Sequence, residues 1–295
     1  MRIKRTDTAQ GRWYNVLHEG ETHRLPSVTT IGAVVGKPAL LRWASKKSVQ
    51  AVLASASAVR EDSATLSSDE YLKAVTTHLQ AEIAKCGACT QGGDQKRHSY
   101  FHERDSHEKS HLGNRVHKRI DYELATRPAP DGLGQDRGAP PPLSVEEDHC
   151  YQKWVAWSRT VDIHPIKVEE QIYSITHGFA GTLDLLAMID LRDGNGPQLS
   201  VVDWKTGGIY EDAFLQSVAY QVAAEERGFG TAVRGLIIQV PREDVDMEIV
   251  EVPPVADLFP VFCSVKTVFD WKQTQPRKKP KKKTPVPFTE SLGDA

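Results

Sequence analysis

The sequence contains few cysteines and no long apolar run, and these two shortages exclude several classes of protein. Four cysteines in 295 residues are too few for the disulfide framework of a small secreted domain. No stretch approaches the roughly 20 apolar residues that a membrane-spanning helix needs. Residues 1–7 also lack the apolar segment of a secretory signal. We therefore expect a globular protein of the cytosol that has no membrane partner.

The chain also lacks an overall excess of basic residues. Its 37 lysines and arginines and its 39 acidic residues leave a net charge of −2, so any binding of nucleic acid would depend on local patches. The most basic stretch, residues 277–283, lies in a C-terminal tail, residues 276–295, that we expect to be disordered. This tail can hold phosphate groups or simply increase solubility, and the sequence favours neither reading.

Two aspartates and a lysine stand out in the middle of the chain. Asp184 begins one apolar run, and Asp203 ends the next, with a Gly-, Asn- and Pro-containing turn between them; this pattern is typical of neighbouring strands. Lys205 follows Asp203 by two residues and therefore points to the same face of a strand. Converging carboxylates are hard oxygen ligands for Mg²⁺ or Mn²⁺, and a lysine beside them can orient a water or neutralise a phosphate. The alternative is a solvated charge pair, which is common for an Asp-x-Lys sequence.

Four motifs in order extend this pattern, namely Glu169 or Glu170, Gly181-Thr182-Leu183-Asp184, Asp203-Trp204-Lys205 and Gln216-Ser217-Val218-Ala219-Tyr220. Their order and spacing resemble the RecB-like exonuclease branch of the PD-(D/E)XK nuclease superfamily. The Asp-Trp-Lys-Thr-Gly sequence and the upstream Pro-Ser-Val-Thr-Thr are similar to phage-type exonucleases and to the mitochondrial genome maintenance exonuclease. The resemblance covers roughly residues 13–52 and 110–272.

This resemblance implies an α/β fold, in which a mixed central β-sheet is flanked by helices as a restriction-endonuclease-like core. It also implies a division of the chain. Residues 1–112 would form an N-terminal hairpin and helical region with a possible lid or arch, residues 113–275 the nuclease core, and residues 276–295 the basic tail.

The resemblance further implies the roles of individual residues. Asp184 and Asp203 would hold the metal together with His117, from a Gly-x-x-x-His motif, and Lys205 would position the nucleophile. One of Glu169 and Glu170 would complete the catalytic set. Neighbouring strand residues point to opposite faces, so only one of them can face the site, and family spacing favours Glu170. Gln216 and Tyr220 would bind the substrate.

The function implied is a Mg²⁺- or Mn²⁺-dependent exonuclease that hydrolyses DNA from a free, single-stranded end during recombination, repair or replication. The partners would be DNA and a recombination or replication protein, in the cytoplasm, or in the host cytoplasm if a phage encodes the chain. Two alternatives are a flap-type endonuclease on the same core and a non-catalytic DNA-binding protein with a silent site.

A separate cluster of cysteines and histidines precedes the Gly-x-x-x-His motif. Cys86 and Cys89 are followed by His98 and His102, a set of residue types that can bind zinc. The gap from Cys89 to His98 is shorter than the roughly 12 residues between the ligand pairs of zinc fingers. We therefore expect a polar loop that leads into a His-rich helix surface, and zinc binding is the alternative.

Overall fold

The computed structural model describes residues 2–8, 10–36, 38–61, 66–86, 89, 98–127, 138–231 and 233–276. Within these ranges the strands are β1 (Arg2–Thr8), β2 (Gly11–His18), β3 (Glu21–Pro26), β4 (Asp162–Ser174), β5 (Phe179–Asp190), β6 (Gln198–Lys205), β7 (Arg234–Gln239) and β8 (Glu248–Glu251). The helices are α1 (Val28–Gly32), α2 (Pro38–Glu61), α3 (Ser68–Ala84), α5 (Phe101–Thr126), α6 (Val145–Ser158), α7 (Glu211–Glu226) and α8 (Val255–Thr274). None of these helices is both long and apolar enough to cross a bilayer.

A mixed five-stranded sheet in the order β4-β5-β6-β7-β8 lies at the centre of the fold. Neighbouring strands are antiparallel except β6 and β7, which run parallel and are joined through α7. A parallel pair needs a long crossover of this kind, usually a helix. The edge strand β4 has a register shift between Pro165 and Lys167, which fits the confinement of proline to edges and bulges because proline has no N–H to donate. The predicted α/β fold with a mixed sheet between helices is therefore confirmed.

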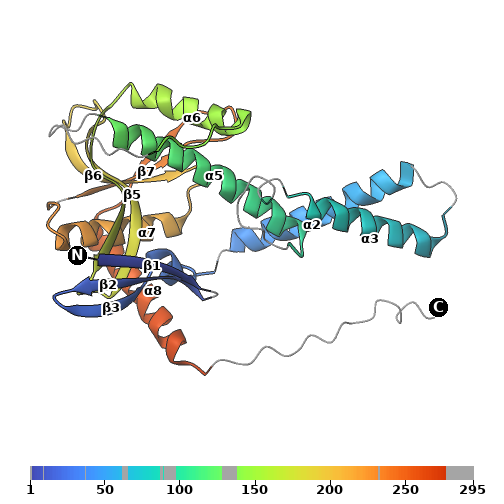
Figure 1. Ribbon diagram of the computed structural model, residues 1–295, viewed down its shortest axis with the longest axis horizontal. Coiled ribbons are helices and arrows are strands. Elements are labelled where there is room, and N and C mark those ends of the chain that lie inside the picture. Colours follow the sequence, from blue (N-terminus) through green and yellow to red (C-terminus); the bar gives the residue numbers. More distant parts are fainter. Residues whose placement is uncertain are drawn as a thin grey trace.

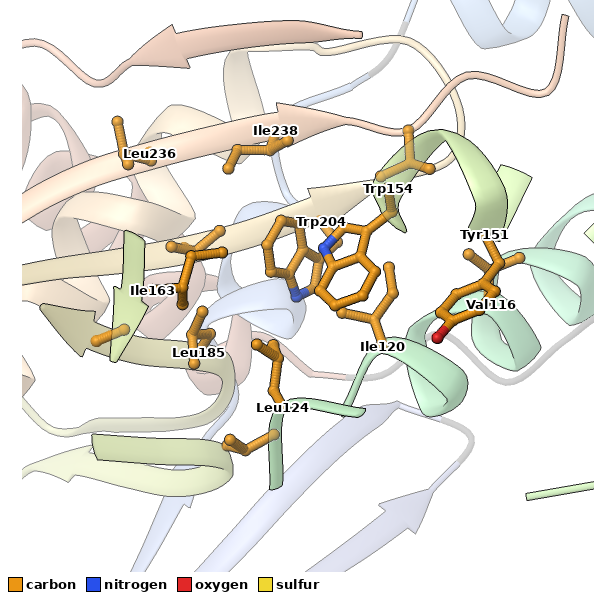
Figure 2. Packing of buried hydrophobic residues seen from close by; sticks show 14 of the residues in the cluster. Val116, Ile120, Leu124, Tyr151, Trp154, Ile163, Leu185, Trp204, Leu236 and Ile238 are labelled. Atoms are coloured by element: carbon orange, nitrogen blue, oxygen red, sulfur yellow. The ribbon is translucent and has the colours of Figure 1, made fainter. Parts of the chain in front are cut away.

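One face of the sheet is covered by α5 and α6. Trp154 and Trp204 are fully buried there, with ring centroids 6.2 Å apart at an interplanar angle of 89°, a favourable edge-to-face geometry. Figure 2 shows these two rings between the aliphatic side chains of α5, such as Ile120 and Leu124, and those of the strands. Because Trp204 is wedged in this core, its neighbours Asp203 and Lys205 are held on the opposite face of β6.

The other face is covered by α1, α7 and α8, whose apolar side chains pack against Leu186, Val201 and Ile237 of the strands. Burial on both faces explains why the runs in β5 and β6 are continuously apolar rather than alternating. The small sheet β1-β2-β3 packs against the end of the β4–β5 hairpin, where Tyr14 and Tyr173 are buried together. The Tyr14 hydroxyl lies 2.9 Å from the Thr182 hydroxyl and so reaches the strand that carries Asp184.

The helices α2 and α3 form an arm that projects away from the sheets, and α5 runs from this arm back to the core (Figure 1). The single helix α5 passes through position 113, at which the core was expected to begin. The far end of the arm points away from the sheets in Figure 1, and only the start of α2 approaches the ends of the central strands. All but the first residue of the expected basic tail, residues 277–295, lies outside the described residues.

Candidate functional site

Asp184 lies where β5 and β6 stop pairing. The register between the two strands ends at Leu185 and Val202. One residue further, an oxygen of the Asp184 carboxylate accepts a hydrogen bond of 3.0 Å from the backbone N–H of Trp204. This hydrogen bond ties the acid on one strand to the strand that carries the second acid, as the two apolar runs predicted.

Asp203 is buried, with 3% of its surface exposed, and both of its carboxylate oxygens have partners. One oxygen forms an ion pair with the Lys205 ammonium, and the other accepts a hydrogen bond of 3.1 Å from the Gln216 side chain. Burial is the largest influence on the pKa of Asp203 and raises it; the Lys205 charge opposes the rise and the Asp184 charge adds to it. Burial lowers the pKa of Lys205, but the two aspartates outweigh it and leave this pKa above its usual value. The lysine is therefore charged at neutral pH.

The helix α5 brings His117 to these acids. Its Nδ1 lies 3.7 Å from a carboxylate oxygen of Asp184. The approach of α5 depends on Gly113, one turn earlier, because a Cβ built there would lie only 2.7 Å from the Thr206 hydroxyl oxygen. The glycine and the histidine of the Gly-x-x-x-His motif thus have linked tasks, since the first permits the contact that positions the second.

The two glutamates of β4 differ in their surroundings. Glu169 is exposed and has a φ of 50°, and its charge acts on Arg5 of β1. Glu170 is half-buried and lies opposite Leu183 in the β4–β5 register. Leu183 is the residue that precedes Asp184 in the chain. The preference for Glu170 over Glu169 stays a prediction.

Gln216 and Tyr220 lie on the same face of α7 but do different things. Gln216 holds Asp203, whereas Tyr220 is 3% exposed and its burial raises its pKa. The Tyr220 ring lies against Gly181, where a built Cβ would come within 2.5 Å of the tyrosine hydroxyl oxygen. The structure therefore gives Tyr220 a packing role that explains the glycine of the Gly-x-x-Asp motif. Its predicted contact with a substrate stays a prediction.

The acids and the histidine match a divalent metal in the type of their donor atoms. Carboxylate oxygens suit Mg²⁺ or Mn²⁺, and an imidazole suits Mn²⁺ better than Mg²⁺. The Asp203 carboxylate is desolvated because it is buried, and a buried carboxylate needs a positive partner. Lys205 is one such partner, and the two aspartates are close enough for the charge of Asp184 to raise the pKa of Asp203. The ligand atoms of His117, Asp184 and Asp203 do not all lie within 4.8 Å of one another.

A cleft of about 430 Å³ opens beside Lys205 and His117. The start of α2 and the middle of α5 form one wall, and the end of β6 with the following loop forms the other. None of the described residues that line it is acidic, whereas its basic and aromatic side chains are Trp43, Lys109, His117, Lys205, Tyr210 and Arg242. No motif singled out Trp43, Lys109, Tyr210 or Arg242 as site residues, because they come from four separate segments.

Cysteines and histidines around the start of α5 come together, but the second histidine is not the one expected. Cys86, Cys89, His98 and His107 place one ligand atom each within 4.8 Å of all the others. His102 lies elsewhere, with Nδ1 3.2 Å from the Ser48 hydroxyl oxygen and its ring stacked on Tyr100. Along a helix, positions 102 and 107 are about 140° apart, so that one faces α2 and the other faces the end of α3.

Neither a comparison with protein-family models nor one with curated proteins finds a match to this chain.

The contact between Gly181 and Tyr220 can be tested by a substitution. Gly181→Ala should lower the free energy of unfolding by about 1–3 kcal/mol, because the added methyl group overpacks the site. In a Tyr220→Leu background the same change should cost clearly less, since the ring carbon and hydroxyl that it would meet are gone. Chemical denaturation of the four proteins of this cycle provides the measurement.

Gly32→Ala is the matched control, because nothing lies within 4 Å of a Cβ built at Gly32. Equal losses for Gly181→Ala in both backgrounds would show that the ring does not set the requirement for glycine.

Proposed function

We propose that this protein is a metal-dependent DNA nuclease with a restriction-endonuclease-like core. The proposal is carried by one arrangement, in which Asp203 and Lys205 are ion-paired at the end of the central strand β6 beside Asp184 of β5. A buried carboxylate, Asp203, beside the half-buried Asp184 and a charged lysine is costly for a structural site, because each desolvated charge must be compensated. Such strained electrostatics are more typical of a functional site.

The neighbouring cleft supports a nucleic-acid substrate. Arg242 adds a positive charge near Lys205, which favours phosphates even though the whole chain is slightly acidic. Lys109 lines the same cleft and is ion-paired with Asp105 at 3.0 Å. Tyr210, which is 49% exposed, and Trp43 supply ring faces on which bases can stack. Stacking on side chains requires unpaired bases, so the cleft favours a single strand over a duplex.

In this proposal Asp184, Asp203, His117 and Glu170 hold the metal, which polarises a phosphoryl oxygen and lowers the pKa of a bound water when it is present. Gln216 fixes the orientation of the Asp203 carboxylate through its hydrogen bond. Lys205 carries a full charge at neutral pH and is held at the acids, where it can stabilise charge that develops on the phosphate. The chain itself thus supplies the ligand set, its alignment and a fixed cation.

We also propose that the enzyme acts from a free end of DNA, as an exonuclease in recombination, repair or replication. The support is the wall that α2 and α5 form along the cleft, opposite β6. A single strand can bend into a walled cleft of this kind, whereas a duplex is stiff over about 150 bp. The structure-specific endonuclease remains the second candidate because the same cleft could take a flap.

The first test is the metal dependence of hydrolysis. The parent should degrade end-labelled single-stranded DNA in Mg²⁺ or Mn²⁺ and lose this activity when a chelator is added. Asp203→Asn should reduce the rate by ~10²-fold or more, as with other electrostatic catalytic groups, and should weaken Mn²⁺ binding in a calorimetric titration.

Asp193→Asn makes the same chemical change in the turn at the opposite end of the β5–β6 hairpin, where Asp193 is exposed, and should leave both properties unchanged. If Asp203→Asn and the parent bind Mn²⁺ equally and cleave equally, Asp203 is not part of a metal site. A parent that binds DNA but does not cleave it under any of these conditions would favour the non-catalytic alternative.

The second test separates catalysis by Lys205 from simple binding of phosphate. Lys205→Ala should lower the turnover of bound DNA by ~10²-fold or more and change DNA affinity far less, since a catalytic cation acts mainly in the transition state. Single-turnover cleavage and equilibrium DNA binding are measured on the same protein. Lys118→Ala, at an exposed position of α5, is the control. A loss of affinity that accounts for the whole defect would make Lys205 an ordinary phosphate contact.

The third test concerns the requirement for an end. A linear single-stranded oligonucleotide should be degraded in Mg²⁺ or Mn²⁺, and the same sequence closed into a circle should resist. Degradation of the circle at a rate comparable to that of the linear form would contradict the exonuclease and favour the endonuclease.

A further inference from the structure

The four residues Cys86, Cys89, His98 and His107 form a compact group at the junction of α3 and α5. His107 Nδ1 lies 3.3 Å from His98 Nε2, 3.5 Å from the Cys86 sulfur and 3.6 Å from the Cys89 sulfur. The Cys89 sulfur also lies 3.4 Å from His98 Nε2. Two nitrogens and two sulfurs therefore point toward one another, although they come from three separate points of the chain.

These spacings agree with the edges of a tetrahedron around a zinc ion. Zinc–nitrogen bonds of about 2.0–2.1 Å and zinc–sulfur bonds of about 2.3 Å place two nitrogens about 3.3 Å apart and a nitrogen and a sulfur about 3.6 Å apart. The His–His distance and three of the four Cys–His distances fall close to these values. His107 Nδ1 approaches three other donor atoms at these distances, and a ring nitrogen with a single hydrogen or lone pair cannot hydrogen-bond to all three.

The donors also select the metal. Two thiolates and two imidazoles in a tetrahedron are typical of structural zinc, whereas Mg²⁺ and Mn²⁺ prefer oxygen. An iron–sulfur cluster with two cysteines on one iron and two histidines on the other would separate the sulfurs from the nitrogens. Here each cysteine is in contact with a histidine, so the geometry favours a single ion. Cys86 is only 1% exposed, which shields the site as a structural centre requires.

The arm formed by α2 and α3 has little hydrophobic core of its own. None of the three hydrophobic clusters among the described residues includes a side chain of α2 or α3. Several large apolar side chains of the arm are instead exposed, among them Leu41, Leu53 and Leu72. A small unit with so little core usually needs a metal or a disulfide to keep its shape.

We propose that Cys86, Cys89, His98 and His107 bind one structural zinc ion that joins the end of α3 to α5. This site is independent of the proposed nuclease centre, because it uses different residues and different donor chemistry. Since α5 also carries Lys109, Gly113 and His117, the zinc ion would anchor the helix that forms one wall of the cleft. Its task would be to hold the arm and this wall in place.

The test is metal analysis of the full chain purified without chelator. The parent should carry about one zinc per chain, and Cys86→Ser and His107→Ala should each carry less than about a tenth of an equivalent. His102→Ala is the matched control, because His102 lies on the same helix outside the group, and it should retain zinc. Asp203→Asn should retain zinc as well, which separates this site from the nuclease centre.

A second measurement does not depend on how the variants fold. Parent protein that has been stripped by a chelator and reloaded with Co²⁺ should show the visible absorption of tetrahedral cobalt together with a thiolate charge-transfer band. Absence of zinc in the parent together with absence of these bands would overturn the proposal. So would zinc that persists in both Cys86→Ser and His107→Ala, zinc that is lost in Asp203→Asn, or iron with labile sulfide in place of zinc.

Discussion

The ion pair between Asp203 and Lys205 lies at the end of β6, with almost all of the Asp203 side chain removed from water. A charge in such a place is costly unless every oxygen has a partner. The fold meets this demand from two directions, with Lys205 on the same strand and Gln216 on α7. Trp204, between the two charged residues, is locked into the opposite core and so prevents β6 from rotating them into solvent. The packing of one face therefore fixes the electrostatics of the other.

Two close approaches depend on this arrangement. Gly181 admits the ring of Tyr220 against β5, and Gly113 admits Thr206 against α5. The first contact sets the distance between α7 and the strand of Asp184, and the second sets the distance between α5 and the end of β6. Because both contacts are close to the limit of van der Waals packing, neither helix can shift without a clash or a loss of packing. The positions of the site's side chains thus depend on the close packing that the two glycines allow.

The helix α5 connects the parts of the molecule that would otherwise be separate. Its start carries His107 of the Cys/His group, its middle lines the cleft, and its second half is buried against the sheet with α6. This helix contributes one histidine to each proposed metal site, His117 to the nuclease centre and His107 to the Cys/His group. The other donors differ, since the first site adds carboxylate oxygens for a hard cation and the second adds cysteine sulfurs for zinc. Such different donor sets let each site select its own ion.

The sequence alone was sufficient for the fold class and for the neighbouring strands that carry Asp184 and Asp203. The fold class followed from the resemblance that four motifs carry, and the two strands followed from apolar runs separated by a turn. Only the tertiary structure decided which histidine completes the Cys/His group, that Tyr220 is buried against Gly181, and that Trp43, Lys109, Tyr210 and Arg242 line one cleft. In each case the residues are far apart in the chain or on different faces of a helix, and their meeting depends on how α2, α3, α5 and the sheet pack together, which no local pattern encodes.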